Sequence, residues 1–203
     1  MSEHNDHVTA SWVRADRIRP FDIVETSRRN GHSRWVAELL FDVLGRRSLD
    51  APDVALRPLL AAQAHRQRDH ADAWRGRLAE LEEFTPENAT RSAGPAMDRL
   101  AAMLRGDLDT LELLVGVHRV VIPRLLAAYV YQRSRTSEIT DGPTIRVLDQ
   151  VIGDCRSDTI DGELMIQSLL RTDADVTRAA ERMRTLEALV VEAGGVCGTG
   201  SIG

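Results

Sequence analysis

The sequence predicts an all-α protein, a bundle of about four long helices with additional short helices. Apolar residues recur at intervals of three and four over several long segments, which is typical of amphipathic helices. No segment of useful length alternates apolar and polar residues as a half-buried strand does. Aromatic residues are scarce, with 3 Trp, 3 Phe and 2 Tyr among 203 residues, and this composition disfavours a β-sandwich or barrel.

The length of the chain predicts a single domain, which we place at residues 15–193. Residues 1–14 are polar and without a period, so we expect a flexible arm. The last ten residues, 194–203, have the sequence GGVCGTGSIG. They are rich in glycine, and we expect this tail to be disordered. A domain of this size can bury a core without disulfides or metals.

The first half of the domain contains two predicted helices. After a lead-in segment interrupted by Pro20, Ser33 is a suitable N-cap for an apolar-periodic stretch that ends at Gly45. Pro52 is suited to the first turn of the next helix, which the periodicity extends to about Glu83. Residues 84–95 have the composition of a loop.

The second half contains the longest periodic stretch, which runs from about 107 to 133 and should be kinked at Pro123. A shorter helix should precede it, and three further helical pieces should follow it. The preceding helix is predicted at 97–104, and two of the following pieces at 144–154 and 160–170. The third is a last amphipathic helix that begins after a cap at Asp173.

The charged residues exclude several classes of function. All 26 basic residues are Arg, so Schiff-base chemistry and the lysine of a phosphate-binding P-loop are impossible. The net charge of −5 and the lack of a dense basic stretch predict no nucleic-acid partner. The chain has two Cys residues and no recognisable secretory signal, so we expect a protein of the reducing cytoplasm. Apolar runs such as 111–117 are too short to span a bilayer, so we expect no membrane partner.

Candidate functional residues are polar side chains that interrupt apolar helix faces. One face of the second helix carries Gln63, Gln67 and His70 between apolar ends, with Trp74 one turn further on. Burying such groups without partners costs about 1–3 kcal/mol each, so they should meet partners or line a polar cavity. On the other helices the candidates are Glu38, Glu112, His118 and Tyr129.

Three stretches resemble the ferritin-like proteins of bacteria. They are QRDHADAWRGRLAEL at 67–81, HRVVIPRLLAAYVY at 118–131 and DGPTIRVLDQVIGD at 141–154, and the resemblance covers about 33–170. It implies a ferritin-like helical bundle in which two helices each supply Glu-x-x-His and two others each supply Glu to a di-iron centre.

The chain departs from this ligand pattern in both halves. Gln67 stands where the first Glu-x-x-His needs a carboxylate, and a neutral amide cannot bridge two iron ions in its place. The stretch 154–158, DCRSD, contains no His. Only Glu38, His70 and Glu112 remain as plausible ligands, so we expect a degenerate site without a metal or other cofactor; iron is the alternative.

The resulting hypothesis is a metal-independent enzyme that acts on a small molecule in the bundle cavity. Glu38, buried and paired with His70, would exchange a proton with the substrate in a cyclisation, isomerisation or elimination. Gln63 and Gln67 would orient the substrate, and the remaining candidates would line its cavity: Trp74, Glu112, His118 and Tyr129. Such chemistry suits bacterial specialised metabolism, by analogy alone.

Two other functions stay open at this point. The chain could be an iron-dependent oxidase or oxygenase with Asp154 or Asp158 replacing a Glu, or a non-catalytic helical binding or scaffold protein. His70 could equally be a core histidine with an ordinary hydrogen bond. Glu112 could be an acid that favours a helix N-terminus. In each case we expect a homodimer, because bundles often pair through helix faces.

Overall fold

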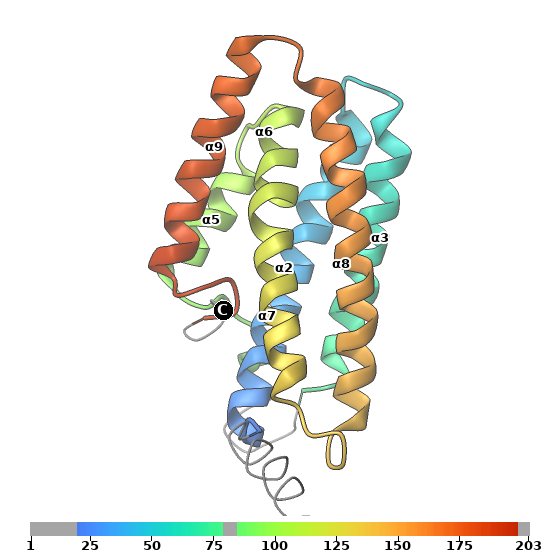
Figure 1. Ribbon diagram of the computed structural model, residues 1–203, viewed down its shortest axis with the longest axis vertical. Helices are drawn as coiled ribbons and strands as arrows, with labels where there is room; N and C mark the ends of the chain where they lie inside the picture. Colours follow the sequence, from blue (N-terminus) through green and yellow to red (C-terminus); the bar gives the residue numbers. More distant parts are fainter. Residues whose placement is uncertain (1–19, 79–84, 199–203) are drawn as a thin grey trace, which may run out of the picture.

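The computed structural model describes residues 20–78 and 85–198, and within these ranges it contains helices and no strand (Figure 1). This confirms the all-α bundle. In chain order the elements are α2 (Ile23–Asp50), α3 (Leu56–Arg75), α4 (Pro86–Ala89), α5 (Pro95–Arg105), α6 (Thr110–Leu114), the π-helix η1 (Val115–Val121), α7 (Ile122–Ser134), α8 (Gly142–Leu169) and α9 (Asp173–Glu192).

Helix α2 is longer at both ends than the sequence predicts. It begins after Asp22, whose side chain accepts a hydrogen bond from the backbone N–H of Glu25, and it continues through the Asn-Gly pair at 30 and 31. Gly31 is needed there because a Cβ at this position would lie 2.1 Å from the carbonyl oxygen of Ala89. The glycine therefore marks a close approach between two segments, and not the end of a helix.

Helices α6, η1 and α7 form one continuous rod at the centre of the molecule (Figure 1). Proline lacks an N–H and its ring clashes with the carbonyl four residues earlier. Ahead of Pro123 the chain widens into a π-helix, in which the N–H of Ile122 bonds to the carbonyl of Val117, five residues back. The helix accommodates Pro123 by this wider π-helical turn, at the place where the sequence predicts a kink.

The rod at 110–134 also corrects the expectation that no apolar segment could span a bilayer. Its 25 residues, Thr110–Ser134, include a window with a mean hydropathy of 1.6, and by length and composition such a helix is long enough. Two thirds of that window, 67%, is buried against the rest of the protein, as in the core helix of a soluble protein. The fold is therefore compatible with a soluble protein.

The arrangement consists of two antiparallel helix pairs and a long crossover. Helices α2 and α3 form the first pair and α7 and α8 the second, and the segment that carries α4 and α5 joins α3 to α6 (Figure 1). Helix α9 runs along the outside and contacts η1, α5 and α6. The apolar core lies between the two pairs and includes Leu40, Leu60, Val117 and Leu148.

Helix α8 is a single element where the sequence predicts two pieces. Residues 155–159 lie within it, and Cys155 and Asp158 are buried there. The polar run that suggests a break is therefore an inward face of a continuous helix. Helix α3 ends at Arg75, earlier than the predicted Glu83, while 79–83 lie outside the described residues.

Part of the glycine-rich tail is packed, although the sequence predicts disorder. Val196 and Cys197 are buried. His32 of α2 donates a hydrogen bond from Nδ1 to the carbonyl oxygen of Cys197, at 2.9 Å. This holds the stretch 194–198 against the bundle. The arm at 1–14 and residues 199–203 lie outside the described residues.

Candidate functional site

The polar face of α3 is buried, as its sequence predicts. Gln63, Gln67, His70 and Trp74 follow one another at steps of four, three and four, so they lie on one side of the helix. All four are buried. The side chains therefore face the bundle interior and must find partners on the other helices or remain without them.

Two of these side chains bond to carboxyl groups of α8. Gln67 donates from Nε2 to Oδ2 of Asp158 at 3.3 Å, and His70 donates from Nε2 to Oδ2 of Asp154 at 2.8 Å. Residue numbers rise along α3 as they fall along α8 because the two helices run in opposite directions (Figure 1). We call these four residues the polar ladder, and it is the centre of the candidate site.

Asp158 is the most deeply buried carboxyl group of the ladder, with an exposed fraction of 0%. Burial raises its pKa to about 6, since a carboxylate is costly to remove from water, although the nearby Arg66 guanidinium opposes the shift. The guanidinium lies 3.4 Å from Oδ1. Asp158 is thus a carboxyl group that can hold or release a proton near neutral pH.

His70 is buried, while its partner Asp154 is 30% exposed. Burial lowers the pKa of His70, and the hydrogen bond to Asp154 acts in the opposite direction. Because a carboxylate can only accept, Nε2 carries the proton and Nδ1 keeps the lone pair. The pair therefore connects a neutral buried imidazole to a carboxylate at the solvent boundary.

Beyond Gln67, towards the start of α3, the amide of Gln63 is buried without a partner. Both of its amide atoms lack a hydrogen bond within the described residues, whereas the imidazole of His118 interacts with the backbone of Asp158. Burial lowers the pKa of His118 to about 4, so the ring is neutral. Its ring packs directly on Gly162 of α8, where a Cβ would lie 2.1 Å from Cγ of the imidazole.

Towards the end of α3, beyond His70, the polar ladder is followed by a pair of aromatic side chains. The rings of Trp74 and Tyr129 lie 5.5 Å apart at 36°, and both side chains are buried. Burial raises the pKa of Tyr129 well above its ordinary value. Tyr129 is therefore a packed neutral phenol, three helical turns from His118 on the same rod, and both residues border the α3 face.

Glu38 does not lie where the sequence-based hypothesis requires. Its side chain is 44% exposed and forms an ion pair with Arg34, one turn earlier on α2, at 2.9 Å. The expectation of a buried Glu38 paired with His70 is wrong, because the apolar neighbours at 39 and 40 face the core while Glu38 lies beside that face. The partner of His70 is Asp154.

Glu112 is also outside the polar ladder. It lies in the first turn of α6 and forms an ion pair with Arg182 of α9 at 3.2 Å. Its place matches the alternative interpretation, in which an acidic residue near a helix N-terminus interacts with the exposed N–H groups. Its contact joins α6 to α9 and does not contribute to the interior site.

The donor groups of the site do not fit the di-iron centre that the resemblance implies. Within the described residues no three His, Cys, Asp or Glu side chains are grouped so that they could hold a metal ion. Glu38 and Glu112 are engaged with arginines elsewhere, and Arg66 places a positive charge beside Asp158. A cation would have to displace this guanidinium in order to use the carboxylate.

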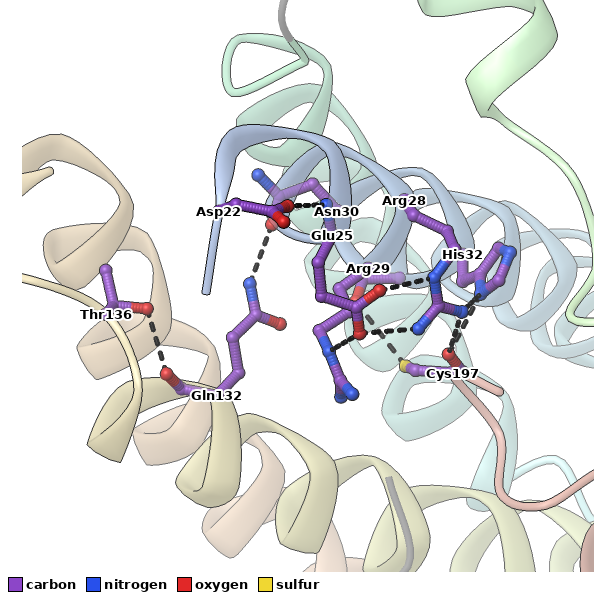
Figure 2. A network of polar contacts seen from close by, with 10 residues as sticks. Asp22, Glu25, Arg28, Arg29, Asn30, His32, Gln132, Thr136 and Cys197 are labelled. Carbon is purple, nitrogen blue, oxygen red and sulfur yellow. Dashed lines mark hydrogen bonds and ion pairs between the residues drawn. The ribbon is translucent and has the colours of Figure 1, made fainter. Parts of the chain in front are cut away.

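A second polar cluster, which sequence reasoning missed, surrounds the first turns of α2 (Figure 2). Glu25 accepts hydrogen bonds from both Arg28 and Arg29, and Arg29 lies over the ring of Phe21 at 4.3 Å. Asn30 accepts from Nε2 of Gln132 at 2.8 Å, which ties α2 to α7. The sequence analysis places Phe21, Glu25 and Arg29 in a lead-in segment before the first helix, so their contacts could not be inferred from helical periodicity.

Sequence reasoning treated Asp154 and Asp158 only as possible replacements for iron ligands. Their spacing of four residues, on a helix whose other inward positions are apolar, is the signal that could have identified them as a buried pair. Arg66 carries no such signal, since other arginines, at 68, 75 and 77, occur close by on different faces of the same segment.

No protein-family model, curated protein or solved structure matches the chain.

Proposed function

We propose that this protein is a metal-independent enzyme that transfers protons on a small molecule at the polar ladder. The observation that carries the proposal is the pairing of two buried acid–base groups on facing helices, His70 with Asp154 and Asp158 with Gln67. In acid–base sites the surroundings typically shift the pKa values of paired titratable groups away from their ordinary values.

The residues would act in distinct roles. The lone pair on Nδ1 of His70 would accept a proton, while Asp154 fixes the ring and stabilises its charged form. Asp158, with its pKa raised to about 6, would return a proton as the acid. Gln63, whose amide has no partner among the described residues, and the neutral imidazole of His118 would bind polar groups of the substrate. Reactions of this kind include cyclisation, isomerisation and elimination.

The ancestry, assembly and location that we propose follow the sequence-based hypothesis. Two antiparallel helix pairs joined by a long crossover are the arrangement expected of a ferritin-like bundle, which supports that origin. A homodimer in the bacterial cytoplasm remains part of the proposal. The iron-dependent oxidase has less support, because the donor groups do not form a di-iron ligand set.

The experiment is a screen for protein-dependent proton exchange. Purified protein is incubated in D₂O with a library of small carbonyl compounds and other acidic C–H compounds, and deuterium incorporation or isomerised product is followed by mass spectrometry. His70→Gln and Asp154→Asn should each lower the rate by about 10²–10⁴-fold, the range for loss of a general acid or base.

Matched controls lie on the same two helices. His65 is an exposed histidine of α3 and Asp149 an exposed carboxylate of α8, so His65→Gln and Asp149→Asn should leave the rate unchanged. Metal analysis of protein from iron-supplemented cells accompanies the assay. Two iron ions per chain with oxygen-dependent turnover would replace the proposal with an oxygenase, and turnover indifferent to His70 and Asp154 would refute it.

A further inference from the structure

A cavity of about 500 Å³ lies at the end of the bundle where α2 and α8 begin. It is also bordered by the residues that follow α3 and α7, so four parts of the chain contribute to its wall. The volume is in the range of small-molecule sites. None of the polar-ladder residues lines it, so this cavity is separate from the proposed acid–base site.

Two buried hydroxyl groups form part of the cavity wall. Ser27 of α2 and Thr144 of α8 are each only 2% exposed. Within the described residues neither hydroxyl has a hydrogen-bond partner, whereas most other Ser and Thr hydroxyls of the helices bond to backbone carbonyls, as Thr185 of α9 does at 2.9 Å. Buried hydroxyls are normally paired, so these two are available to a molecule in the cavity.

Hydrogen bonds to residues outside the cavity fix further polar groups of the wall. Thr136 donates to the carbonyl of Gln132, and the side chain of Gln132 donates to Asn30. Asn30 in turn donates to the carbonyl of Arg77 at 3.1 Å. This chain of bonds links α2, α7 and the residues that follow α3, so it fixes the positions of three parts of the wall relative to one another.

The charges on the wall select among ligand classes. Asp141 uses Oδ1 to accept from the backbone N–H of Thr144, and its other oxygen has no partner among the described residues. Arg77 supplies one positive charge on the same wall, so the charges of Asp141 and Arg77 balance among the described residues of the lining. The hydroxyl groups and the free carboxylate oxygen suit a ligand that donates and accepts hydrogen bonds, the carboxylate disfavours a strong anion, and Phe21, Ile23 and Leu78 offer apolar contacts to the carbon skeleton of such a ligand.

We propose that this cavity binds a neutral polyhydroxylated molecule of monosaccharide or disaccharide size, held by hydrogen bonds to Ser27, Thr144 and Asp141. Hydroxyl groups of such a ligand both donate and accept, which suits the two protein hydroxyls, and they donate to the carboxylate. The inference does not rest on the proposed proton-transfer function, since the two sites share no residue.

The test measures binding of D-glucose, D-ribose and sucrose by calorimetry and by saturation-transfer NMR, with hexanol and citrate as contrasting probes. At least one of the sugars should bind saturably. The double variant Ser27→Ala/Thr144→Val should bind it about thirtyfold more weakly, since it loses two hydrogen bonds that contribute about 1 kcal/mol each. Thr185→Val is the control, because that hydroxyl bonds to a carbonyl within α9.

A measurement on the free protein separates binding from structure. Removing an unpartnered buried hydroxyl should leave the midpoint of urea unfolding unchanged or raise it, so weaker binding cannot then be attributed to loss of fold. The proposal is overturned if none of the three sugars binds saturably, or if the double variant binds as well as the native protein. Variant-sensitive binding of hexanol or citrate in place of the sugars also overturns it.

Discussion

Asp158 shows how the surroundings of one residue set its chemistry. Its neighbour along the ladder, Asp154, is partly exposed and hydrogen-bonded to His70, whereas Asp158 is fully buried beside an amide and a guanidinium. Burial raises the pKa of Asp158 to about 6. A carboxyl group shielded from water can therefore keep its proton close to neutral pH.

The pKa of Asp158 predicts how stability depends on pH. Between pH 4 and 6 the folded protein holds a proton that the unfolded chain has released, because the pKa rises from 3.8 to about 6 on folding. Stability from this group is therefore present at low pH and is lost as pH rises through 6. Asp158→Asn removes this titration, so the variant should gain stability relative to the native protein by up to about 3 kcal/mol between pH 4 and 7.

Urea unfolding of both proteins at intervals over this pH range provides the measurement. Subtracting one curve from the other cancels His118, whose lowered pKa acts in the opposite direction over the same interval. A difference that stays flat or declines with pH would mean that Asp158 is ionised throughout. Asp149→Asn, at an exposed site on α8, is the control and should change stability by less than about 1 kcal/mol.

At the scale of elements, the fit between the π-helix η1 and α8 positions His118. The wide turn ahead of Pro123 brings the imidazole against α8, and Gly162 leaves the space that the ring occupies. Sequence periodicity places His118 on the inner face correctly, but it assumes α-helical spacing. The contact with a glycine 44 residues later depends on how the two helices pack, which no local pattern encodes.

Two glycines of α8 provide a matched test of this packing. At Gly162 a Cβ would lie 2.1 Å from the His118 ring, so Gly162→Ala should destabilise the protein by about 1–3 kcal/mol, as overpacking does. At Gly153 nothing lies within 4 Å, so Gly153→Ala should stabilise it by roughly 0.5–1 kcal/mol through helix propensity. Chemical unfolding of both variants gives the comparison, and equal effects at the two sites would contradict the described contact.

At the scale of the whole molecule, residues that are far apart in the sequence pack against one another. The tail residue Cys197 lies against Ser33 and His32 of α2, about 165 residues earlier in the chain. Glycine-rich composition indicates backbone freedom, yet Gly194, Gly195 and Gly198 use that freedom in positive-φ conformations to return the chain to the bundle. Composition cannot distinguish a disordered tail from one that turns tightly onto a surface.

The packing of the tail gives a prediction that contrasts two valines. Val196 is 1% exposed and Val191, near the end of α9, is 60% exposed. Val196→Ala should lower the free energy of unfolding by about 1–3 kcal/mol, because it leaves a cavity, while Val191→Ala should change it by less than about 0.5 kcal/mol. Chemical unfolding measures both, and an effect near zero for Val196 would restore the disordered tail that composition predicts.

Local patterns in the sequence determined the helices and the polar face of α3. The spacing of Gln63, Gln67, His70 and Trp74 is enough to place these side chains on one buried stripe, since helical geometry depends only on residues within two turns. The sequence predicts the cap of the last helix one residue too late, since the side chain of Thr172 caps α9 and the predicted Asp173 is its first residue. The all-α class therefore followed from the chain alone, whereas the number of helices did not, since α8 is one element where the sequence predicts two.

The partners of those side chains were decided by the tertiary structure. His70 bonds to Asp154 and not to Glu38, and Gln67 bonds to Asp158, because α3 and α8 pack in one register and direction. Hydrogen bonds and desolvation act over a few ångströms, while the residues involved are 84 and 91 positions apart. The sequence by itself determined which groups face inward, and only the packing of the helices decided which of them meet and which carboxyl group is shielded from water.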